Sequence, residues 1–281
     1  MRVGFQGEAG AYSEEALLSL FPAAAARGFR TFEQTFDALL SGEIETAVLP
    51  VENSLGGIVQ EVNDLLWDRK GLKLTGEYVH PIRHHLLGRR NDVPQRVISH
   101  PQALAQVRRF LEARALAAVP FYDTAGAARQ VAERPEAGTA AVASARAGRR
   151  YGLDVLAAGI QDSDSNRTRF VVGERGRPER PAAGRPGWKT SLCFAAAHQP
   201  GSLFRALECF SARQVNLARL ESRPLLGKPF EYLFFLDFQI GDPDQAEAAL
   251  SALESRAAEV RLFGTFGPLS GGLDGGEQLG Q

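Results

Sequence analysis

Polar side chains follow one of the predicted strands at the point where it ends. Glu52, Asn53 and Ser54 follow the apolar run Thr46–Pro50 after Val51, and the glycine pair 56–57 comes shortly after them. In α/β sheets, ligands bind beyond the carboxyl ends of the strands. Carboxylate, amide and hydroxyl groups in that position suit the binding of a small polar molecule and the movement of its protons.

Four other segments share this place at a strand end. The first is the glycine-rich turn Gly4–Ser13, whose glycines fit neither the dinucleotide fingerprint nor the phosphate loop. The second is Ser99–Gln106, and the third is Asp123–Ala125. The fourth is the polar loop Asp162–Phe170, which places Thr168 and Arg169 at the mouth of a strand. Together they predict a pocket of hydroxyls, amides and helix N-termini for an anionic small molecule.

Neither a metal site nor a cofactor is expected. The histidines are His80, His84, His85, His100 and His198. Adjacent side chains of a strand point to opposite faces, so His84 and His85 make a poor chelate. The two cysteines, Cys193 and Cys209, have no zinc-site spacing and are predicted to be buried thiols.

Composition excludes several classes of protein. Apolar residues make up 44% and charged residues 23% of the 281 residues, and the formal net charge is −1. These values are typical of a globular protein and offer no basic surface for nucleic acid. No apolar run approaches the roughly 18 residues of a membrane span. The first residues resemble a strand and not an export signal, which predicts a cytoplasmic location.

Short apolar runs alternate with helical patterns up to about residue 173. Strands are expected at Arg2–Phe5, Thr46–Pro50, Arg96–His100, Leu116–Tyr122, Thr139–Ala143 and Thr168–Gly173. Helices are expected at Tyr12–Phe21, Thr31–Leu40, Ile58–Trp67, after Pro101, after Thr124 and at Ser144–Tyr151. Thr31 and Thr124 are the expected N-caps. This alternation predicts an α/β domain with mostly parallel sheets.

The segment Glu174–Gly187 is rich in Arg, Pro and Gly and is predicted to be an extended linker. The order of elements then changes. Strands are expected at Lys189–Ala195, Asn216–Arg223, Glu231–Ile240 and Glu259–Phe266, with a turn near Gly227 and helices at 200–210 and 243–257. This βαββαβ order is the ferredoxin-like arrangement. The glycine-rich tail after Phe266 is expected to be loosely ordered.

The five polar segments, in this order, strongly resemble the prephenate dehydratase family. The matching motifs are GxxGAYSExA, PVENSxxG, SHPQAxxQ, DTAxAA and GIQDxxxNxTRF. The C-terminal part resembles the ACT regulatory domain of that family through Pro200, Gly201, Ser202, Leu203, Asn216, Leu217, Glu221, Ser222, Arg223 and Pro224. Position 202 departs from the family, which usually has Ala there.

The resemblance implies a fold and a division into domains. The catalytic domain, residues 1–175, would be two-lobed like type II periplasmic binding proteins, with one lobe at about 1–79 plus 156–175 and the other at 80–155. A linker at 176–187, a ferredoxin-like ACT domain at 188–266 and a flexible tail at 267–281 would follow.

The resemblance also implies an activity. Prephenate would lose carbon dioxide and water and become phenylpyruvate in phenylalanine biosynthesis. Aromatisation of the ring supplies the electron sink that other decarboxylases take from a cofactor, so no cofactor is expected. Thr168 would hydrogen-bond the departing hydroxyl.

The other site residues receive roles by the same resemblance. Arg169 would pair with the pyruvyl carboxylate or form a structural ion pair. Glu52 would hold a proton or cap a helix. The substrate-binding residues would be Asn53, Ser54, Ser99, Gln106, Thr124, Ala125 and Phe170. The ten ACT residues would bind phenylalanine as effector, in a homodimer or homotetramer. Alternatives are an arogenate dehydratase and a non-enzymatic amino-acid-binding regulator.

Overall fold

The computed structural model describes residues 1–196, 199–225 and 231–271, and the expected turn near Gly227 lies outside them. By contacts between Cα atoms the chain forms two compact units. Of the described residues, the first contains Met1–Val59, Tyr78–Phe170, Ser270 and Gly271, and the second contains Gln60–Glu77 and the described part of Val171–Leu269. Each unit is described by itself below.

Most of the predicted elements up to residue 175 are present, but the sequence did not predict β2, β4, β6, β10 or the ten-residue strand β5. The strands are β1 (Arg2–Gln6), β2 (Ala25–Phe29), β3 (Thr46–Asn53), β4 (Gly57–Ile58), β5 (Leu72–Pro81), β6 (His85–Gly88), β7 (Arg96–Ser99), β8 (Ala117–Pro120), β9 (Thr139–Ala143), β10 (Asp154–Ala157) and β11 (Arg167–Arg175). The helices are α1 (Tyr12–Leu20), α2 (Phe32–Ser41), α3 (Gln60–Asp68), α4 (Pro101–Gln106), α5 (Arg108–Ala113), α6 (Thr124–Glu133) and α7 (Ala145–Tyr151).

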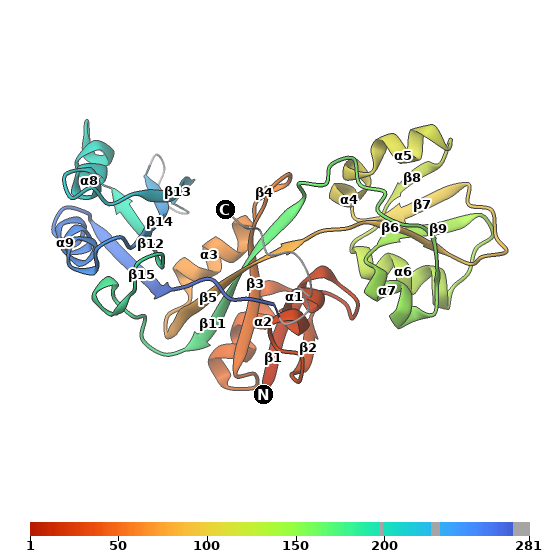
Figure 1. Cartoon of the computed structure of the whole chain (residues 1–281), viewed down its shortest axis with the longest axis horizontal. Coiled ribbons are helices and arrows are strands. Elements are labelled where there is room, and N and C mark those ends of the chain that lie inside the picture. The colour runs from red at the N-terminus through yellow and green to blue at the C-terminus, as the bar shows by residue number, and fades with distance from the viewer. Residues whose placement is uncertain (197–198, 226–230, 272–281) are drawn as a thin grey trace. The chain divides into compact units, whose positions relative to one another are not determined.

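These strands form two sheets, which are the cores of two lobes (Figure 1). The first sheet has the order β2-β1-β3-β11-β5, with β4 paired to β3, and the second has the order β10-β6-β9-β7-β8. The chain leaves the first sheet after β5 and returns to it at β11, so the second sheet is built from a continuous insertion. β1 pairs in parallel with β2 and β3, and β7 pairs in parallel with β8 and β9.

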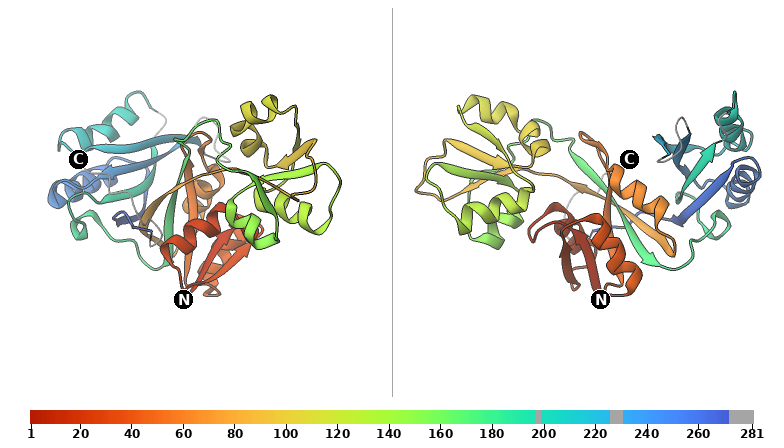
Figure 2. Two further views of the ribbon diagram at one scale, coloured as in Figure 1. Left: turned by 45° about the vertical axis from the view of Figure 1, so that its right-hand side comes forward. Right: turned by 180° about the vertical axis from the view of Figure 1, so that it is seen from behind.

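Alternating residues give the second sheet two apolar faces. Leu86, Val97, Ala140 and Val142 pack with α4 and α5, whereas Leu87, Ile98, Ala141 and Ala143 pack with α6 and α7. Both views of Figure 2 show these helix pairs on opposite sides of the sheet. The period of two, which is the pleat of a strand, therefore produces a three-layer lobe.

Capping residues set the helix boundaries. Thr31 caps α2, as predicted, by accepting a hydrogen bond from Gln34 N at 3.1 Å, and Gly42 ends that helix in the left-handed conformation. The cap of α6 is Asp123 and not the expected Thr124, since the Asp123 carboxylate accepts from Gly126 N at 2.7 Å. A carboxylate one residue earlier reaches the free amide groups of the first turn, which makes Thr124 the first helical residue.

The C-terminal elements form a βαββαβ sheet. They are β12 (Lys189–Ala196), α8 (Ser202–Ser211), β13 (Leu217–Pro224), β14 (Tyr232–Gln239), α9 (Pro243–Glu254) and β15 (Glu259–Phe266). The strand order is β13-β14-β12-β15, with antiparallel neighbours. Both helices cover one face of the sheet over a phenylalanine-rich core (Figure 1). The predicted fold class is confirmed in its architecture: an α/β part with two lobes and a ferredoxin-like C-terminal part.

Two segments that were expected to be loose have packed partners. In the predicted linker, Pro181 is buried, and the Arg180 guanidinium pairs with Glu247 and Glu254 on α9. In the predicted tail, Leu269 N donates to Glu77 O at 2.7 Å. A composition without large apolar side chains predicts a lack of core, but ion pairs and backbone hydrogen bonds still anchor such a segment.

The remaining expectations from composition concern thiols and membranes. Cys193 and Cys209 are both unpaired and buried, as predicted. Within the residues that the structure describes, no helix combines the length and apolar character needed to cross a bilayer.

Gly10 allows the two lobes to approach each other. Its φ is +95°, and a Cβ there would lie 2.8 Å from the Cα of Ala147 on α7. We expect Gly10→Ala to lower the free energy of unfolding by about 2–4 kcal/mol, from strain and overpacking together. The measurement is denaturation of the full chain, with Gly57→Ala as control. Gly57 has φ +77° but nothing within 4 Å, so about 1–2 kcal/mol is expected. Equal losses in both variants would contradict the packing role.

Candidate active site

The side-chain amide of Asn53 is held in one orientation. Its Oδ1 accepts hydrogen bonds from Leu55 N at 3.1 Å and from Gly56 N at 2.7 Å. Both donors belong to the turn that joins β3 to β4, so the local backbone fixes which end of the amide is the oxygen. The amide nitrogen must therefore point away from the turn.

The amide nitrogen of Asn53 points at the first residues of β11. Asn53 Nδ2 donates to Thr168 Oγ1 at 2.9 Å, to Asn166 Oδ1 at 2.9 Å and to Arg167 O at 3.1 Å. Because Thr168 Oγ1 accepts from an amide, its own hydroxyl hydrogen is free to be donated elsewhere. Asn53 and Thr168, which are 115 positions apart in the sequence, thus make a preorganised hydroxyl donor.

Gln106 brings the second lobe to this pair. Its Oε1 accepts from Asn166 Nδ2 at 2.8 Å, and its Nε2 lies 3.5 Å from Asn53 Oδ1. Gln106 ends the short helix α4, and Asn166 is fully buried just before β11. The two predicted residues Asn53 and Gln106 are therefore part of one hydrogen-bonded cluster.

Two further residues extend the cluster. His84 Nε2 lies 2.8 Å from Gln106 Oε1, and the Tyr12 hydroxyl lies 2.8 Å from His84 Nδ1. Since Gln106 Oε1 can only accept, the network assigns the imidazole hydrogen to Nε2 and leaves Nδ1 as an acceptor. The Tyr12 hydroxyl also contacts Arg83 O at 3.0 Å.

Burial keeps this part of the cluster neutral. It lowers the pKa of His84 from the ordinary value and raises the pKa of Tyr12 well above it. Both shifts have the same cause, because a low-dielectric surrounding disfavours whichever form carries charge. The cluster thus orients hydrogen-bond donors and acceptors without adding a net charge.

Ser54 and Ser99 have structural bonds in place of the expected substrate contacts. The Ser54 hydroxyl donates to Ser165 O and accepts from Arg167 N, both at 2.9 Å, and so fixes the start of β11. The Ser99 hydroxyl is fully buried and donates to Val142 O at 2.6 Å, which joins β7 to β9. The positions of the two serines in the sequence could not reveal these hydrogen bonds. Ser99 ends β7 and Ser54 directly follows β3, which are the places where ligand-binding residues are expected.

Thr124 and Ala125 form the first turn of α6. Thr124 is half-buried there, and Ala125 has no exposed surface. Because the Ala125 side chain is fully buried, any contribution of Ala125 to ligand binding must come from its backbone. The Asp123 carboxylate already accepts hydrogen bonds from the backbone of this turn, including Gly126 N at 2.7 Å.

The remaining predicted residues, Arg169, Phe170 and Glu52, lie apart from the Thr168 hydroxyl because of their positions on β11 and β3. Successive side chains of β11 point to opposite faces, so Arg169 lies on the face opposite Thr168. Phe170, which was expected to contact substrate, is 1% exposed and packs in the apolar core. Glu52 is half-buried on β3, where it pairs with Ile58 of β4.

Three residues of the cluster were not predicted as site residues: Tyr12, His84 and Asn166. Tyr12 and Asn166 do stand in the polar segments at strand ends, so their position was a usable signal. His84 was considered only as a metal ligand, and its bonds to Tyr12 and Gln106 join residues 72 and 22 positions away.

The predicted effector residues divide between the two ends of the C-terminal sheet. Pro224 and Ala196 both pair with Tyr232, so Ser222–Pro224 and the start of α8 share one end. Asn216 lies at the other end, where its Nδ2 donates to Gln239 Oε1 at 2.9 Å beside a crevice of about 550 Å³. The eight residues of β13 span roughly 25 Å, so one amino acid cannot touch both ends. Within one chain, these predicted effector residues therefore do not form one pocket.

The start of α8 is itself internally bonded. Gly201 is its N-cap, with φ +78°, and Arg205 donates to Pro200 O and to Ser202 Oγ, each at 3.1 Å. On the sheet, Leu217 and Glu221 pair with Phe238 and Phe235. Leu203 packs against the core of this part.

Arg223 has a different partner from the expected effector. Its Nε donates to Asp64 Oδ1 at 2.6 Å, its Nη2 donates to Asp64 Oδ2, and its Nη1 donates to Gln60 Oε1 at 2.7 Å. This two-pronged ion pair joins β13 to the first two turns of α3. Fork-to-carboxylate pairs are among the strongest and most directional hydrogen-bonded contacts.

The cluster around Thr168 suits a reaction in which an oxygen leaves as water. It offers a hydroxyl hydrogen from Thr168 and a hydrogen-bonded chain that crosses from one lobe to the other. Among the described residues, no group of three His, Cys, Asp or Glu side chains is placed to hold a metal ion.

The family model of prephenate dehydratase matches residues 3–177, more than half of the chain. The chain belongs to the prephenate dehydratase family. It is therefore a dehydratase, a carbon–oxygen lyase of aromatic amino-acid biosynthesis, and the predicted family and enzyme class are confirmed.

Similar proteins agree with this membership. Arogenate dehydratase/prephenate dehydratase 2, chloroplastic, of Arabidopsis thaliana is 40% identical over 95% of this chain and 72% of its own length. The prephenate dehydratase of Arthrobacter aurescens, solved in complex with L-Phe, has 28% identity and a TM-score of 0.86 over 95% of this chain and 90% of its own. A structure described as GqqA, a novel type of quorum quenching acylases, has 35% identity and a TM-score of 0.87 over 95% and 98%.

The predicted cytoplasmic location is contradicted by these comparisons, because the Arabidopsis relative is named chloroplastic. The prediction came from the residue types at the start of the chain. The packing of a folded domain carries no record of the compartment in which the protein works.

Because burial lowers the pKa of His84, the free energy of unfolding depends on pH on the acid side of neutrality. Because its pKa is lowered in the folded state, the unfolded chain binds a proton more readily once the pH falls below about 6.5, and stability is lost in that direction. We expect His84→Gln to lose less stability than the unmodified chain between pH 7.5 and about 5. Thermal denaturation across this range measures it.

His85→Gln is the matched control for this measurement. Burial also lowers the pKa of His85, but this side chain is only partly buried, so a smaller effect is expected. An unchanged acid sensitivity in His84→Gln would contradict the assignment.

Proposed function

We propose that this protein converts prephenate to phenylpyruvate, carbon dioxide and water in phenylalanine biosynthesis. The observation that carries the proposal is the hydrogen bond from Asn53 Nδ2 to Thr168 Oγ1, which leaves the Thr168 hydroxyl hydrogen available. Membership in the prephenate dehydratase family supports the same reaction. Residues 1–175 are the catalytic domain in this proposal.

The reaction divides into two bond cleavages that aromatise the ring. The bond from the ring to its carboxylate breaks and carbon dioxide leaves, and the electron pair moves into the ring. The bond from the opposite ring carbon to its hydroxyl then breaks, and one added proton converts the departing hydroxide to water. The protein must help the hydroxide leave without over-stabilising the ring carboxylate.

Thr168 donates its hydroxyl hydrogen to the departing oxygen. A threonine hydroxyl is a weak acid, so it orients or relays a proton and is not the final source. General acid help of this kind contributes roughly 10²–10⁴-fold, or about 3–5 kcal/mol of barrier. Positioning of the substrate supplies further rate enhancement.

Substrate binding falls to groups around Thr168. Asn53 and Gln106 hold the cluster in place, and the backbone amide of Thr124 donates a hydrogen bond to an anionic end of the substrate. Ala125 lies in the same helical turn, where its backbone bonds to the Asp123 carboxylate. Ser54 keeps the start of β11 in register. Glu52 precedes Asn53 on β3, and Arg169 follows Thr168 on β11. This proposal assigns neither of them a contact with the Thr168 hydroxyl.

We expect Thr168→Ala to lower kcat by roughly 10²–10⁴-fold. Thr168→Ser retains the hydroxyl and should keep activity within about tenfold, since only the methyl packing is lost. The measurement is the absorbance of phenylpyruvate formed from prephenate by the purified protein, with thermal denaturation as a check on folding. Near-normal turnover by the alanine variant would overturn the assignment of Thr168.

Arogenate is a second candidate substrate. It carries an amino group where prephenate carries a ketone, and its dehydration yields phenylalanine directly. The relative of 40% identity named arogenate dehydratase/prephenate dehydratase favours testing it. Comparison of kcat/KM on the two substrates decides between them.

Regulation by phenylalanine belongs to the same proposal. Residues 188–266 are an ACT regulatory domain that binds phenylalanine and inhibits the enzyme. The Arthrobacter aurescens structure was solved with L-Phe, and the C-terminal βαββαβ sheet has the topology that the family resemblance implied. A homodimer or homotetramer is part of this proposal.

Arg223 is the connection from the regulatory sheet to the active site. Its guanidinium holds Asp64 and Gln60 on α3, and α3 begins just after β4. In β4, Gly57 pairs with Asn53 of the active-site cluster. A displacement of β13 on effector binding would therefore pull on the chain segment that orients the catalytic amide.

We expect Asp64→Asn to raise the phenylalanine concentration for half-inhibition by about 3- to 10-fold, because a coupling contact is lost. Glu61→Gln is the control, since Glu61 is an exposed carboxylate on the same helix. Inhibition curves of the full chain provide the measurement. If both variants respond to phenylalanine like the unmodified chain, the coupling role of the Arg223–Asp64 pair is wrong.

A further inference from the structure

One end of the Gln106 side-chain amide is fully bonded and the other end is not. Its Oε1 accepts two hydrogen bonds, from Asn166 Nδ2 and from His84 Nε2, each at 2.8 Å. Its Nε2 carries two hydrogen atoms, and among the described residues its acceptor is Asn53 Oδ1 at 3.5 Å, which is the limit of a hydrogen bond. At least one hydrogen of Gln106 Nε2 is therefore available to another molecule.

The backbone determines the direction of every hydrogen bond in this chain of side chains. The two N–H groups of the turn after Asn53 can only donate, so they identify Asn53 Oδ1 and hence Asn53 Nδ2. Asn53 Nδ2 can only donate, so the oxygen of Asn166 faces it and the nitrogen of Asn166 faces Gln106. Gln106 must then present its oxygen to Asn166. His84 faces the same oxygen, so the His84 hydrogen must lie on Nε2.

Tyr12 holds the other nitrogen of the His84 ring. The Tyr12 hydroxyl lies 2.8 Å from His84 Nδ1, and the two rings meet edge to face with their centroids 5.5 Å apart. Nδ1 carries no hydrogen in this tautomer, so Tyr12 donates to it. His84 is buried, and burial lowers its pKa, which favours the neutral ring that this arrangement needs.

Thr168 and Gln106 flank the Asn53 amide, one at each end. Thr168 Oγ1 accepts from Asn53 Nδ2 at 2.9 Å, whereas Gln106 Nε2 lies 3.5 Å from Asn53 Oδ1. Since a single amide group separates them, the Thr168 hydroxyl hydrogen and the available Gln106 hydrogen can contact different oxygens of one small molecule.

We propose that His84 is a positioning residue of the dehydratase, whose Nε2–H fixes the Gln106 amide so that Gln106 Nε2 donates to an oxygen of the substrate beside Thr168. An amide that rotated freely would also present its oxygen, which repels an anionic substrate. Turned over in this site, the amide would set its own hydrogen atoms against the donors of Asn166 and His84, and two hydrogen bonds would be lost. The inference rests on the proposed dehydratase function and deepens it.

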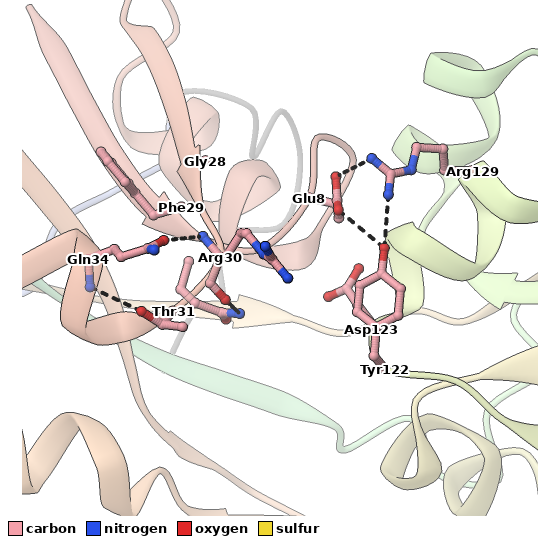
Figure 3. Close-up of a pocket in the computed structure, with 11 residues that line it drawn as sticks. Glu8, Gly28, Phe29, Arg30, Thr31, Gln34, Tyr122, Asp123 and Arg129 are labelled. Atoms are coloured by element: carbon pink, nitrogen blue, oxygen red, sulfur yellow. Dashed lines mark hydrogen bonds and ion pairs between the residues drawn. The ribbon is translucent and has the colours of Figure 1, made fainter.

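A second contact between the lobes provides a comparison. Arg129 Nη1 donates to Glu8 Oε2 at 3.0 Å beside a crevice of about 870 Å³, and the Tyr122 hydroxyl bonds to both side chains (Figure 3). Among the described residues, none of these three side chains bonds to Gln106. A residue that only holds the lobes together should therefore behave like Arg129, and a residue that orients Gln106 should not.

A double-mutant cycle on the full chain, with kcat/KM on prephenate as the readout, tests the role of His84. We expect His84→Leu to lower kcat/KM by about 10-fold, the worth of one buried hydrogen bond. The Tyr12 hydroxyl keeps Arg83 O as an acceptor in this variant. In a Gln106→Leu background, His84→Leu should change kcat/KM by less than about threefold, because the amide that it orients is gone.

Two further variants complete the cycle. The side-chain amide of His84→Gln can still donate to Gln106 Oε1, so this variant should keep kcat/KM within about threefold of the unmodified value. Arg129→Gln replaces His84→Leu in the control cycle, where its effect should be the same with and without Gln106. Thermal denaturation checks that each variant is folded. Equal effects of His84→Leu in both backgrounds would show that His84 acts independently of Gln106 and would overturn the proposal.

Nitrogen-15 NMR of the histidine side chains tests the same geometry without turnover. Protonated and unprotonated ring nitrogens of neutral histidine resonate in well-separated ranges, and the His84 signals are those lost in His84→Gln. At about pH 7.5 we expect a protonated Nε2 and an unprotonated Nδ1. A hydrogen on Nδ1 would reverse the orientation of Gln106 and overturn the proposal.

The outcomes separate this inference from the proposed function. If the unmodified protein turns over neither prephenate nor arogenate, the dehydratase function fails and the role of His84 in it fails as well. If the protein turns over prephenate but the His84 and Gln106 effects are additive, dehydration stands and the positioning role of His84 is wrong.

Discussion

Asn53 lies where the end of β3, a tight turn and the start of β11 meet, and its amide cannot rotate. The turn supplies two backbone hydrogen atoms to Oδ1, and this leaves Nδ2 to face β11. Thr168 accepts from that nitrogen and keeps its own hydrogen for another oxygen. The Thr168 hydroxyl can donate to another oxygen only with the amide in this orientation. A flipped amide would present Oδ1 to Thr168 and accept its hydrogen.

The cluster around Asn53 also ties the lobes together. Gln106 and His84 belong to the inserted segment, whereas Asn53, Asn166 and Tyr12 belong to the first lobe. Their hydrogen bonds are neutral, so the lobes meet without the desolvation cost of a buried ion pair. On another side of the same unit, Glu8 and Arg129 do pair as ions, at a partly exposed position where water lowers that cost.

The second unit uses charge to anchor segments that have few apolar side chains. Arg180 pairs with two glutamates of α9, and Arg223 forks onto Asp64 of α3. Bidentate pairs are directional, so they fix the orientation of the two elements that they join. This gives the regulatory proposal its physical route and explains why the Arg-rich stretch near residue 180 is packed.

The sequence by itself determined most of the helices, the α/β and βαββαβ parts of the fold and the segments that supply the site. Period-two alternation and helix caps such as Thr31 are local properties, so they can be read from neighbouring residues. Polar residues after apolar runs located Asn53, Gln106 and Thr168 for the same reason.

The tertiary structure alone decided which of these side chains are free to act. Ser54, Ser99 and Arg223 have side chains that could bind a ligand, but these side chains form hydrogen bonds to partners far away in the chain. The opposite holds for His84 and Asn166, which join the cluster only through long-range hydrogen bonds. Each side chain can donate or accept only a few hydrogen bonds. Its partners are the groups that lie close in space in the folded protein, which need not be close along the chain.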